Sequence, residues 1–314
     1  MPFFSVVIPL YNKEKHIKGT IKSVLDQSFG DFEIIIVNDG STDNSATIVD
    51  SIQDKRILKF DIENKGVCHA RNYGISKASS KLIAFLDADD YWYPFHLSDL
   101  KKLYEEFPNC GLYAKAYFKQ FENVKIASIF NKIPQTENWM GIVDDYFASS
   151  HINCIAWTSA VMVPKSIFKD VGNFDEKITM GAGEDIDLWM RIALKFPVAF
   201  HNKVSAIHML HAENRISNTN TNLRQFIDLD KYNPESQSNK SLKTYLDLNR
   251  YSIALQYKLA FNNKKANDYI KNLDSSNLNW KQNLLLKVNS RLLKILFQLK
   301  FKLRQKGINL SSYR

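Results

Sequence analysis

The sequence has few cysteines, no long apolar run and no acidic residue near its C-terminus. Its three cysteines, Cys68, Cys110 and Cys154, are odd in number and form no CxxC pair, which argues against a disulfide framework or a zinc site. Such thiols fit a reducing compartment, and we expect a cytoplasmic protein. No stretch reaches the ~18 apolar residues of a membrane span. Residues 3–10 are apolar, but Pro9 interrupts them and no basic residue precedes them, so they predict a first strand rather than a signal peptide.

The net charge of +9 is confined to one end of the chain. Residues 275–314 contain six Lys, three Arg and no Asp or Glu, so the first 274 residues are formally neutral. A nucleic-acid-binding protein should carry its basic residues on the folded domain. The distribution therefore argues against a nucleic-acid partner and calls for a separate explanation of the C-terminal tail.

Strand and helix patterns alternate through the first hundred residues. We predict strands at 4–9, 32–37, 57–60 and 82–86, with helices between them at 16–27, 46–52 and 67–78. This order is typical of a doubly wound parallel α/β sheet, whose ligands lie beyond the carboxyl ends of the strands. We expect a sheet domain over 1–220, a linker over 221–241 and a helical extension over 242–314.

The strand predicted at 82–86 ends in three carboxylates, Asp87, Asp89 and Asp90. Crowded carboxylates repel one another unless a cation neutralises them, so Mg²⁺ or Mn²⁺ is a natural ligand there. A capping aspartate at a strand-to-loop transition explains the same residues equally well. Asp39 and Arg71 should lie at the same sheet edge, where they could bind a nucleoside and a phosphate. Each also has an ordinary interpretation as a turn residue or a solvated helix residue.

Taken together, these segments resemble the family 2 glycosyltransferases. The resemblance spans roughly residues 4–217, and its motifs fall in register: 6–12 (VVIPLYN), 37–43 (VNDGSTD), 64–66 (NKG) with 70–72 (ARN), 85–90 (FLDADD) and 183–191 (GEDIDLWMR). It implies a GT-A fold, with a Rossmann-like nucleotide-binding half at 1–105 and an acceptor half at 106–220. It also implies that Pro9, Tyr11 and Asp39 hold the base and ribose, usually of uridine, and that Arg71 lies near the donor.

The same resemblance implies a metal site and a catalytic base. Asp87, with Ala88 beside it, would bind ribose or metal, and Asp89 would ligate a Mn²⁺ or Mg²⁺ ion that bridges the diphosphate. His211, within the segment 211–217 (HAENRIS), would complete the metal site or contact the diphosphate; His208 fits that pattern less well. Asp185 would be the general base; it follows a Gly-rich loop and opens a helix, where stabilisation by the helix N-terminus is the alternative.

The implied activity is that of an inverting hexosyltransferase that is metal-dependent and non-processive, since the Gln-x-x-Arg-Trp motif of processive members is missing. The expected donor is a UDP-sugar, and the acceptor is a saccharide or lipid-linked saccharide in bacterial surface polysaccharide or glycolipid assembly. Two other classes stay open: a nucleotide-sugar-binding, membrane-associated protein without activity, and an aspartyl-phosphate hydrolase. The hydrolase would leave Asp39 and the loop at 64–71 unexplained.

Residues 280–306 have the pattern of a basic amphipathic helix. The apolar positions are Leu285, Val288, Leu292, Leu296, Leu299 and Leu303, and the opposite face carries Lys287, Arg291, Lys294, Gln298 and Lys302. This pattern is typical of an anchor that lies in the plane of an anionic membrane surface. We therefore expect peripheral attachment to the inner face of the cell membrane. The alternative is that the stripe packs on the catalytic domain or on a second copy in a homodimer.

Overall fold

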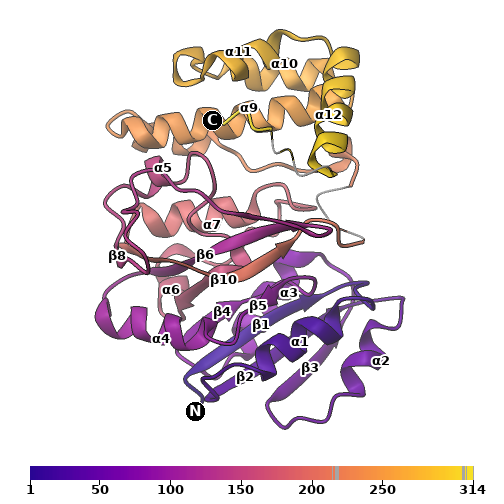
Figure 1. Ribbon diagram of the computed structural model, residues 1–314, viewed down its shortest axis with the longest axis vertical. Helices are drawn as coiled ribbons and strands as arrows, with labels where there is room; N and C mark the ends of the chain where they lie inside the picture. The colour runs from indigo at the N-terminus through magenta and orange to yellow at the C-terminus, as the bar shows by residue number, and fades with distance from the viewer. Residues whose placement is uncertain (214, 216–218, 306–307, 309, 314) are drawn as a thin grey trace.

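The computed structural model describes residues 1–213, 215, 219–305, 308 and 310–313 (Figure 1). Its centre is one ten-stranded sheet in which β3 (Ile57–Ile62), β2 (Phe32–Asp39), β1 (Phe4–Leu10) and β4 (Leu82–Phe85) are neighbours in that order and all parallel. β1, β2 and β4 are nearly all apolar because both faces of the sheet are covered. The predicted α/β class and the parallel first half are thus confirmed.

Helices α1 (Ile17–Leu25), α2 (Ser45–Asp50) and α3 (Val67–Lys77) connect these strands. Helix α3 lies against β1 and β2. A Cβ atom at Gly74 would come within 2.5 Å of Val7 Cγ1, so this close approach of helix and strand requires glycine. The packing brings the first turn of α3 to the carboxyl edge of the sheet, beside the ends of β1 and β2.

The second half of the sheet is mixed. Strand β9 (Val161–Pro164) is antiparallel to β4 and to β6 (Leu112–Phe121), and β10 (Val198–Met209) is parallel to β6. The shorter strands β5 (Tyr91–Trp92), β7 (Val124–Ala127) and β8 (Met140–Ile142) add antiparallel edges. The helices of this half are α4 (His96–Glu106), α5 (Tyr146–Ser149), α6 (Ile167–Val171) and α7 (Glu184–Ala193).

The stretch 221–241, expected to be a linker, is packed against the sheet domain. It forms short helices, including α8 (Asn233–Ser236), and buries Ile227, Leu229 and Tyr232. The Tyr232 hydroxyl donates a hydrogen bond to Asp187 Oδ1 at 2.7 Å, and Lys231 forms an ion pair with the same carboxylate. The polar composition of this stretch concealed the few apolar residues that hold it.

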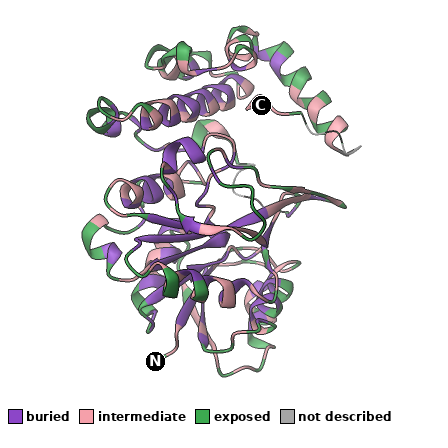
Figure 2. Cartoon of the chain, turned by 60° about the vertical axis from the view of Figure 1, so that its left-hand side comes forward, coloured by how far each residue is buried: buried purple, intermediate pink, exposed green. Residues whose placement is uncertain are grey.

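The C-terminal helices form a layer above the sheet domain (Figure 1). They are α9 (Lys240–Leu259), α10 (Asn263–Lys271), α11 (Trp280–Lys287) and α12 (Ser290–Gln305). Helix α9 docks on α5, with the Tyr245 and Phe147 ring centroids 5.8 Å apart. Figure 2 shows α9 largely buried, whereas the outermost helices are mostly exposed. Among the described residues, no helix is long and apolar enough to cross a membrane.

The segment predicted as one helix over 280–306 is divided into α11 and α12. Val288 is extended, with ψ of 136°, and the Asn289 side chain accepts a hydrogen bond from Leu292 N–H at 2.9 Å, which begins the second helix. Leu293 is fully buried against α9 in a small core with Leu248, Tyr251 and Leu255. Helix α12 therefore uses a face for packing that the predicted apolar stripe does not include.

Two substitutions one position apart should separate these faces. We expect Leu293→Ala to lower the free energy of unfolding by about 2–4 kcal/mol, because it leaves a cavity in the core beneath α12. Leu292→Ala, at a side chain that is 45% exposed, should change it by less than about 1 kcal/mol. Urea unfolding followed by circular dichroism would measure both, and equal effects would contradict the assignment of the faces.

Candidate active site

The carboxyl edge of the parallel strands opens onto a cavity of about 1130 Å³. Strand register brings the edge together, because Leu10 of β1 pairs with Asn38 of β2 and Val7 pairs with Phe85 of β4. Eight of the nine predicted site residues line this cavity: Pro9, Tyr11, Asp39, Arg71, Asp87, Ala88, Asp89 and Asp185. The ninth, His211, is not among the lining residues; His208 is.

Asp39, the last residue of β2, joins two of the motif segments. Its Oδ1 accepts a hydrogen bond from Lys65 N–H at 2.8 Å and its Oδ2 one from Gly66 N–H at 2.9 Å. Gly66 has φ of 93°, a conformation that suits glycine and lets both amides turn toward the carboxylate. Each carboxylate oxygen can accept a second hydrogen bond, so Asp39 can hold the loop and still bind a nucleoside.

Arg71 is buried between two carboxylates. Its Nη2 lies 2.7 Å from Asp87 Oδ1, its Nη1 lies 3.2 Å from Glu184 Oε1, and only 4% of the side chain is exposed. Burial opposes the charge, but the two carboxylates raise the pKa of Arg71 above its usual value. The guanidinium fork that we expected to meet phosphate is thus largely engaged with protein, and it ties the end of β4 to the start of α7.

Asp90 shows that one of the three clustered acids is structural. Its carboxylate is buried, with Oδ1 accepting a hydrogen bond from Met209 N–H at 3.0 Å and Oδ2 one from Ser159 Oγ at 2.6 Å. Burial, reinforced by Asp89 and Asp87, raises its pKa well above the ordinary value. Asp90 therefore secures the end of β10, although it also borders the cavity.

The Asp89 carboxylate forms an ion pair with a lysine side chain of the same chain. Lys13 Nζ lies 2.7 Å from Asp89 Oδ2 and 2.9 Å from the carbonyl oxygen of Glu213. Among the described residues no group of three or more His, Cys, Asp or Glu could hold a metal ion by itself. Mg²⁺ is usually held by one or two carboxylates together with substrate phosphates, so a single carboxylate at the cavity wall fits such an ion. The Lys13 ammonium pairs with the same carboxylate oxygen, so an ion bound there would have to compete with it.

His211 is less suited to a metal than its sequence pattern suggested. It is exposed, and its Nδ1 accepts a hydrogen bond from Glu122 N–H at 3.2 Å. In neutral imidazole the other nitrogen then carries the hydrogen, so Nε2 is a donor rather than a ligand. Because His211 also lies outside the cavity lining, its geometry supports neither the metal role nor the diphosphate role implied for it.

Asp185 opens α7 at the far wall of the cavity. Gly183 precedes it with φ of 100°, and a Cβ atom there would come within 2.8 Å of Ile227 Cγ2, so the entry to the helix requires glycine. Thr158 Oγ1 lies 3.5 Å from Asp185 Oδ2. Burial raises the pKa of Asp185, and the Arg71 guanidinium opposes that shift. A half-buried carboxylate with a raised pKa is a stronger proton acceptor than a solvated one.

Sequence reasoning missed several residues that line the cavity. Trp157 stacks on His208 with ring centroids 4.8 Å apart, and Arg215 Nη2 lies 2.9 Å from His208 Nε2. Lys13 stands next to a recognised motif, so its position could have suggested a role. Trp157 lies in a region without readable motifs, and only the three-dimensional structure brings it to the site.

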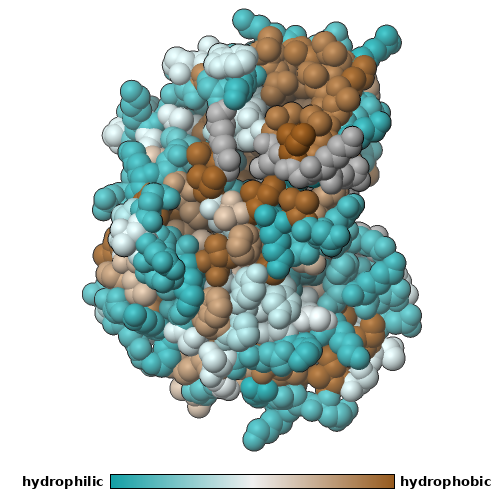
Figure 3. Space-filling model, in the orientation of Figure 1, coloured by the Kyte–Doolittle hydropathy of each residue, from teal (hydrophilic) through white to brown (hydrophobic). Residues whose placement is uncertain are grey.

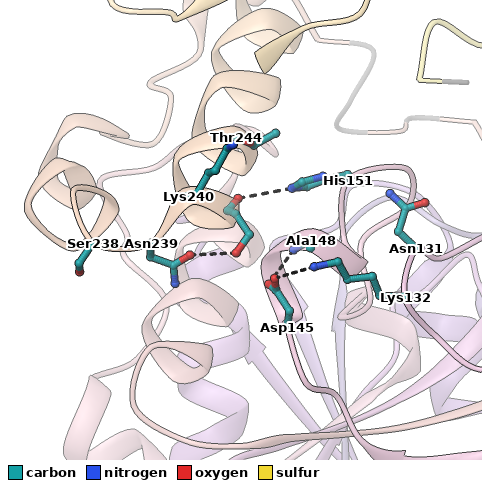
Figure 4. A pocket seen from close by; sticks show the side chains of 10 residues that line it. Asn131, Lys132, Asp145, Ala148, His151, Ser238, Asn239, Lys240 and Thr244 are labelled. Atoms are coloured by element: carbon teal, nitrogen blue, oxygen red, sulfur yellow. Dashed lines mark hydrogen bonds and ion pairs between the residues drawn. The ribbon is translucent and has the colours of Figure 1, made fainter. Parts of the chain in front are cut away.

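A second hollow lies between α5 and α9 (Figure 4). Its polar side chains serve the two helix ends that form it. Asp145 accepts a hydrogen bond from Ala148 N–H at 3.0 Å, and Asn239 accepts one from Leu242 N–H at 2.9 Å. His151 Nε2 lies 3.4 Å from the Ser241 carbonyl oxygen. Two of these contacts cap helices and the third joins the C-terminal helices to the sheet domain. We therefore interpret the hollow as the junction between these two layers and not as a second active site.

Comparison with known proteins covers part of this site. Residues 5–172 match the model for Glycosyl transferase family 2, which leaves Asp185, His208 and His211 outside the matched region. An uncharacterized glycosyltransferase of Rickettsia conorii is 35% identical over 231 residues, covering 73% of this chain and 35% of that protein. The minor teichoic acid biosynthesis protein GgaA of Bacillus subtilis is 41% identical over 112 residues, covering 33% of this chain and 24% of that protein. The chain thus spans about a third or less of the length of these relatives.

Among solved structures, S. aureus TarS 1-349 in complex with UDP-GlcNAc aligns with a TM-score of 0.59. The alignment covers 93% of this chain and 88% of that one, at 16% identity. At this level of identity the likeness concerns the fold alone, and it confirms the predicted GT-A architecture with C-terminal helices.

Removing the Arg71 guanidinium should destabilise the folded protein. We expect Arg71→Met to lower the free energy of unfolding by about 3–5 kcal/mol, because it leaves Asp87 and Glu184 without a counter-charge in a buried place. Adding Glu184→Gln should recover part of that loss. Thermal and urea unfolding of the single and double variants would measure both effects, and a neutral Arg71→Met would contradict the buried bridge.

Proposed function

Because the chain belongs to glycosyl transferase family 2, we propose that it transfers a sugar from a UDP-sugar to a hydroxyl of a saccharide or lipid-linked saccharide, with inversion at the anomeric carbon. The observation that carries this proposal is that one cavity is lined by Asp39, Asp89 and Asp185, which come from three separate motifs. Together they offer a nucleoside-binding carboxylate, a cation-binding carboxylate and a proton acceptor.

The donor would lie along the edge of β1, β2 and β4. Tyr11 is 46% exposed and presents a ring to the cavity against which a uracil could stack. Asp39 would accept a hydrogen bond from the base or ribose, and Pro9 would close the base site. Arg71 acts here mainly by positioning Asp87, which would bind the ribose or the metal.

Asp89 would hold a Mn²⁺ or Mg²⁺ ion together with oxygens of the donor diphosphate. When bound, such an ion stabilises the negative charge that develops on the departing nucleoside diphosphate. Arg215, which also lines the cavity, adds a permanent positive charge at that end of the site.

Asp185 would remove the proton from the acceptor hydroxyl while the hydroxyl oxygen attacks the anomeric carbon from the face opposite the leaving group. The new glycosidic bond forms as the bond from the anomeric carbon to the diphosphate oxygen breaks, and the proton stays on the Asp185 carboxyl. The raised pKa of Asp185 supports this role, since proton transfer is more favourable to a stronger base.

The assembly of a bacterial surface polysaccharide is the context we propose. GgaA is described as a teichoic acid biosynthesis protein, and TarS has been solved with UDP and with UDP-GlcNAc. These facts concern those proteins, and they make UDP-GlcNAc and teichoic acid the first donor and acceptor to test here.

The decisive test is Asp185→Asn. We expect it to bind UDP with nearly unchanged affinity and to lower the transfer rate at least about 10²-fold, because a neutral amide cannot accept the proton. Transfer from a panel of nucleotide sugars, with and without Mn²⁺, would be followed by UDP release and product analysis. In the wild-type protein the acidic limb of the pH–rate profile should lie above the usual pKa of Asp. Wild-type turnover by the variant would exclude Asp185 as the base, and phosphate release from simple esters would favour a hydrolase.

We also propose that the protein attaches to an anionic membrane surface through its last two helices. Exposed apolar residues of α12 include Leu292, Ile295, Leu296 and Leu299, which have the i, i+3, i+4 and i+7 spacing of one helix face. We call these four residues the apical patch; brown residues gather over this end of the molecule at the upper right of Figure 3. Phe301 is also exposed, and its ring lies against that of Phe121. In α11, Trp280 and Leu284 are also exposed. Leu293 packs inward against α9, so the face with Leu292 and Leu296 is a second apolar face of α12, and its residues stay exposed.

Charge indicates which partner suits the apical patch. Residues 275–314 contain nine basic and no acidic residues, which suits an anionic lipid surface. In a symmetric dimer through this face, two sets of the same basic side chains would approach each other. A membrane surface is therefore the better partner, and the cell membrane is where a lipid-linked acceptor would be found.

Liposome binding would test this attachment. Replacing Leu292, Leu296 and Leu299 with Ser should lower partitioning onto vesicles containing phosphatidylglycerol by at least about tenfold, because about 0.8 kcal/mol is lost per buried CH₂. Leu58→Ser, at a 40% exposed position on β3, is the matched control and should have no effect. Binding of wild type should weaken with salt. Equal partitioning of all three proteins, or a concentration-dependent dimer that the triple variant abolishes, would contradict the membrane assignment.

A further inference from the structure

Lys13 connects three parts of the cavity wall. It follows β1 in the chain, its ammonium donates to Asp89 after β4, and it also donates to the carbonyl oxygen of Glu213 after β10. Only 11% of the Lys13 side chain and 14% of the Asp89 side chain are exposed. An ion pair so shielded from water is screened far less than a surface pair, so it strongly influences what else can bind Asp89.

The backbone of Lys13 is held in place, whereas its side chain is long and flexible. The Lys13 N–H donates to Ser45 Oγ at 2.8 Å, and the neighbouring Asn12 Oδ1 accepts a hydrogen bond from Thr42 N–H at 2.7 Å. These bonds fasten the loop after β1 to the loop after β2. A change of partner for the ammonium therefore needs only rotation of the four-carbon stem, with no movement of the sheet edge.

We propose that Lys13 is a tethered counter-ion that occupies the cation position on Asp89 until donor and metal arrive together. This inference rests on the proposed function, because it assigns Asp89 to a divalent ion. The ammonium and the ion compete for the same carboxylate, so the donor-free protein binds the metal weakly. A nucleoside diphosphate supplies oxygens that both ligate the metal and offer the ammonium a new anionic partner.

The consequence is positive coupling between metal and nucleotide. A metal ion bound alone would leave the Lys13 ammonium without its carboxylate partner. When the nucleoside diphosphate binds as well, the metal takes the place of Lys13 on Asp89 and the diphosphate takes the place of Asp89 beside Lys13. By thermodynamic linkage, the factor by which UDP strengthens metal binding equals the factor by which the metal strengthens UDP binding. Lys13 thereby keeps Asp89 neutralised in the empty site and keeps free metal from occupying it.

The test measures Mn²⁺ binding to the donor-free protein by electron paramagnetic resonance of free Mn²⁺. We expect Lys13→Met to bind Mn²⁺ about tenfold more tightly than wild type, because the competing ammonium is gone. The matched control is Lys15→Met. It removes the same charge two residues along the chain from Lys13, where Lys15 forms an exposed ion pair with Glu213. It should leave Mn²⁺ affinity within about twofold of wild type. Calorimetry should show that UDP and Mn²⁺ strengthen each other about tenfold less in Lys13→Met than in wild type.

Two further variants keep the outcome decisive. Lys13→Gln, which retains a hydrogen-bond donor without the charge, serves if Lys13→Met does not fold. Adding Asp89→Asn to Lys13→Met should abolish the gain in Mn²⁺ affinity, which ties the effect to that carboxylate. Unchanged or weaker Mn²⁺ binding by the folded Lys13 variants, with sugar transfer still dependent on Mn²⁺, would overturn the counter-ion role and leave the proposed function standing. Sugar transfer by wild type that needs no divalent ion would overturn both the metal assignment and this inference.

Discussion

The buried bridge from Arg71 to Asp87 and Glu184 is the interaction on which the geometry of the site depends. Asp87 follows β4 and Glu184 begins the helix that carries the proposed base, so one guanidinium links these two walls of the cavity. Such a bridge is costly to desolvate, and its value lies in specifying one arrangement rather than in adding stability. Losing either carboxylate partner would leave Arg71 as a buried, half-compensated charge.

Charge compensation is repeated throughout the cavity wall. Asp39 is satisfied by two backbone amides, Asp90 by Ser159 and a backbone amide, and Asp89 by Lys13. These carboxylates look alike in the sequence, but they differ in how readily they could bind a ligand. Asp90 is bonded to β10, Asp89 is paired with a flexible lysine, and Asp185 borders the cavity while it accepts hydrogen bonds from Ile186 N–H at 2.8 Å and Thr158 Oγ1 at 3.5 Å. These differences follow from burial and partners, which no motif records.

The fold and most of the site could be predicted because local patterns and global structure agree. Parallel strands end at a common edge, so residues following β1, β2 and β4 had to converge, and they do. The prediction failed where tertiary contacts decide. The helix expected over 280–306 is interrupted at Val288, and residues 221–241 are held by Tyr232 and Asp187 although their composition is that of a linker. His208 of β10 reaches the cavity although its sequence pattern fitted less well than that of His211, and Trp157 reaches it from a region without a readable motif.

The packing of the C-terminal helices also bears on how such proteins can diversify. Tyr232 bonds to the helix that carries Asp185, and Tyr245 of α9 lies with Cys154 and Tyr146 behind that residue. The family match ends at residue 172, yet the wall supporting the base is completed by side chains some sixty to seventy residues further on. A recombination event that exchanged the chain from Tyr232 onward would therefore alter the surroundings of Asp185 as well as the proposed attachment surface.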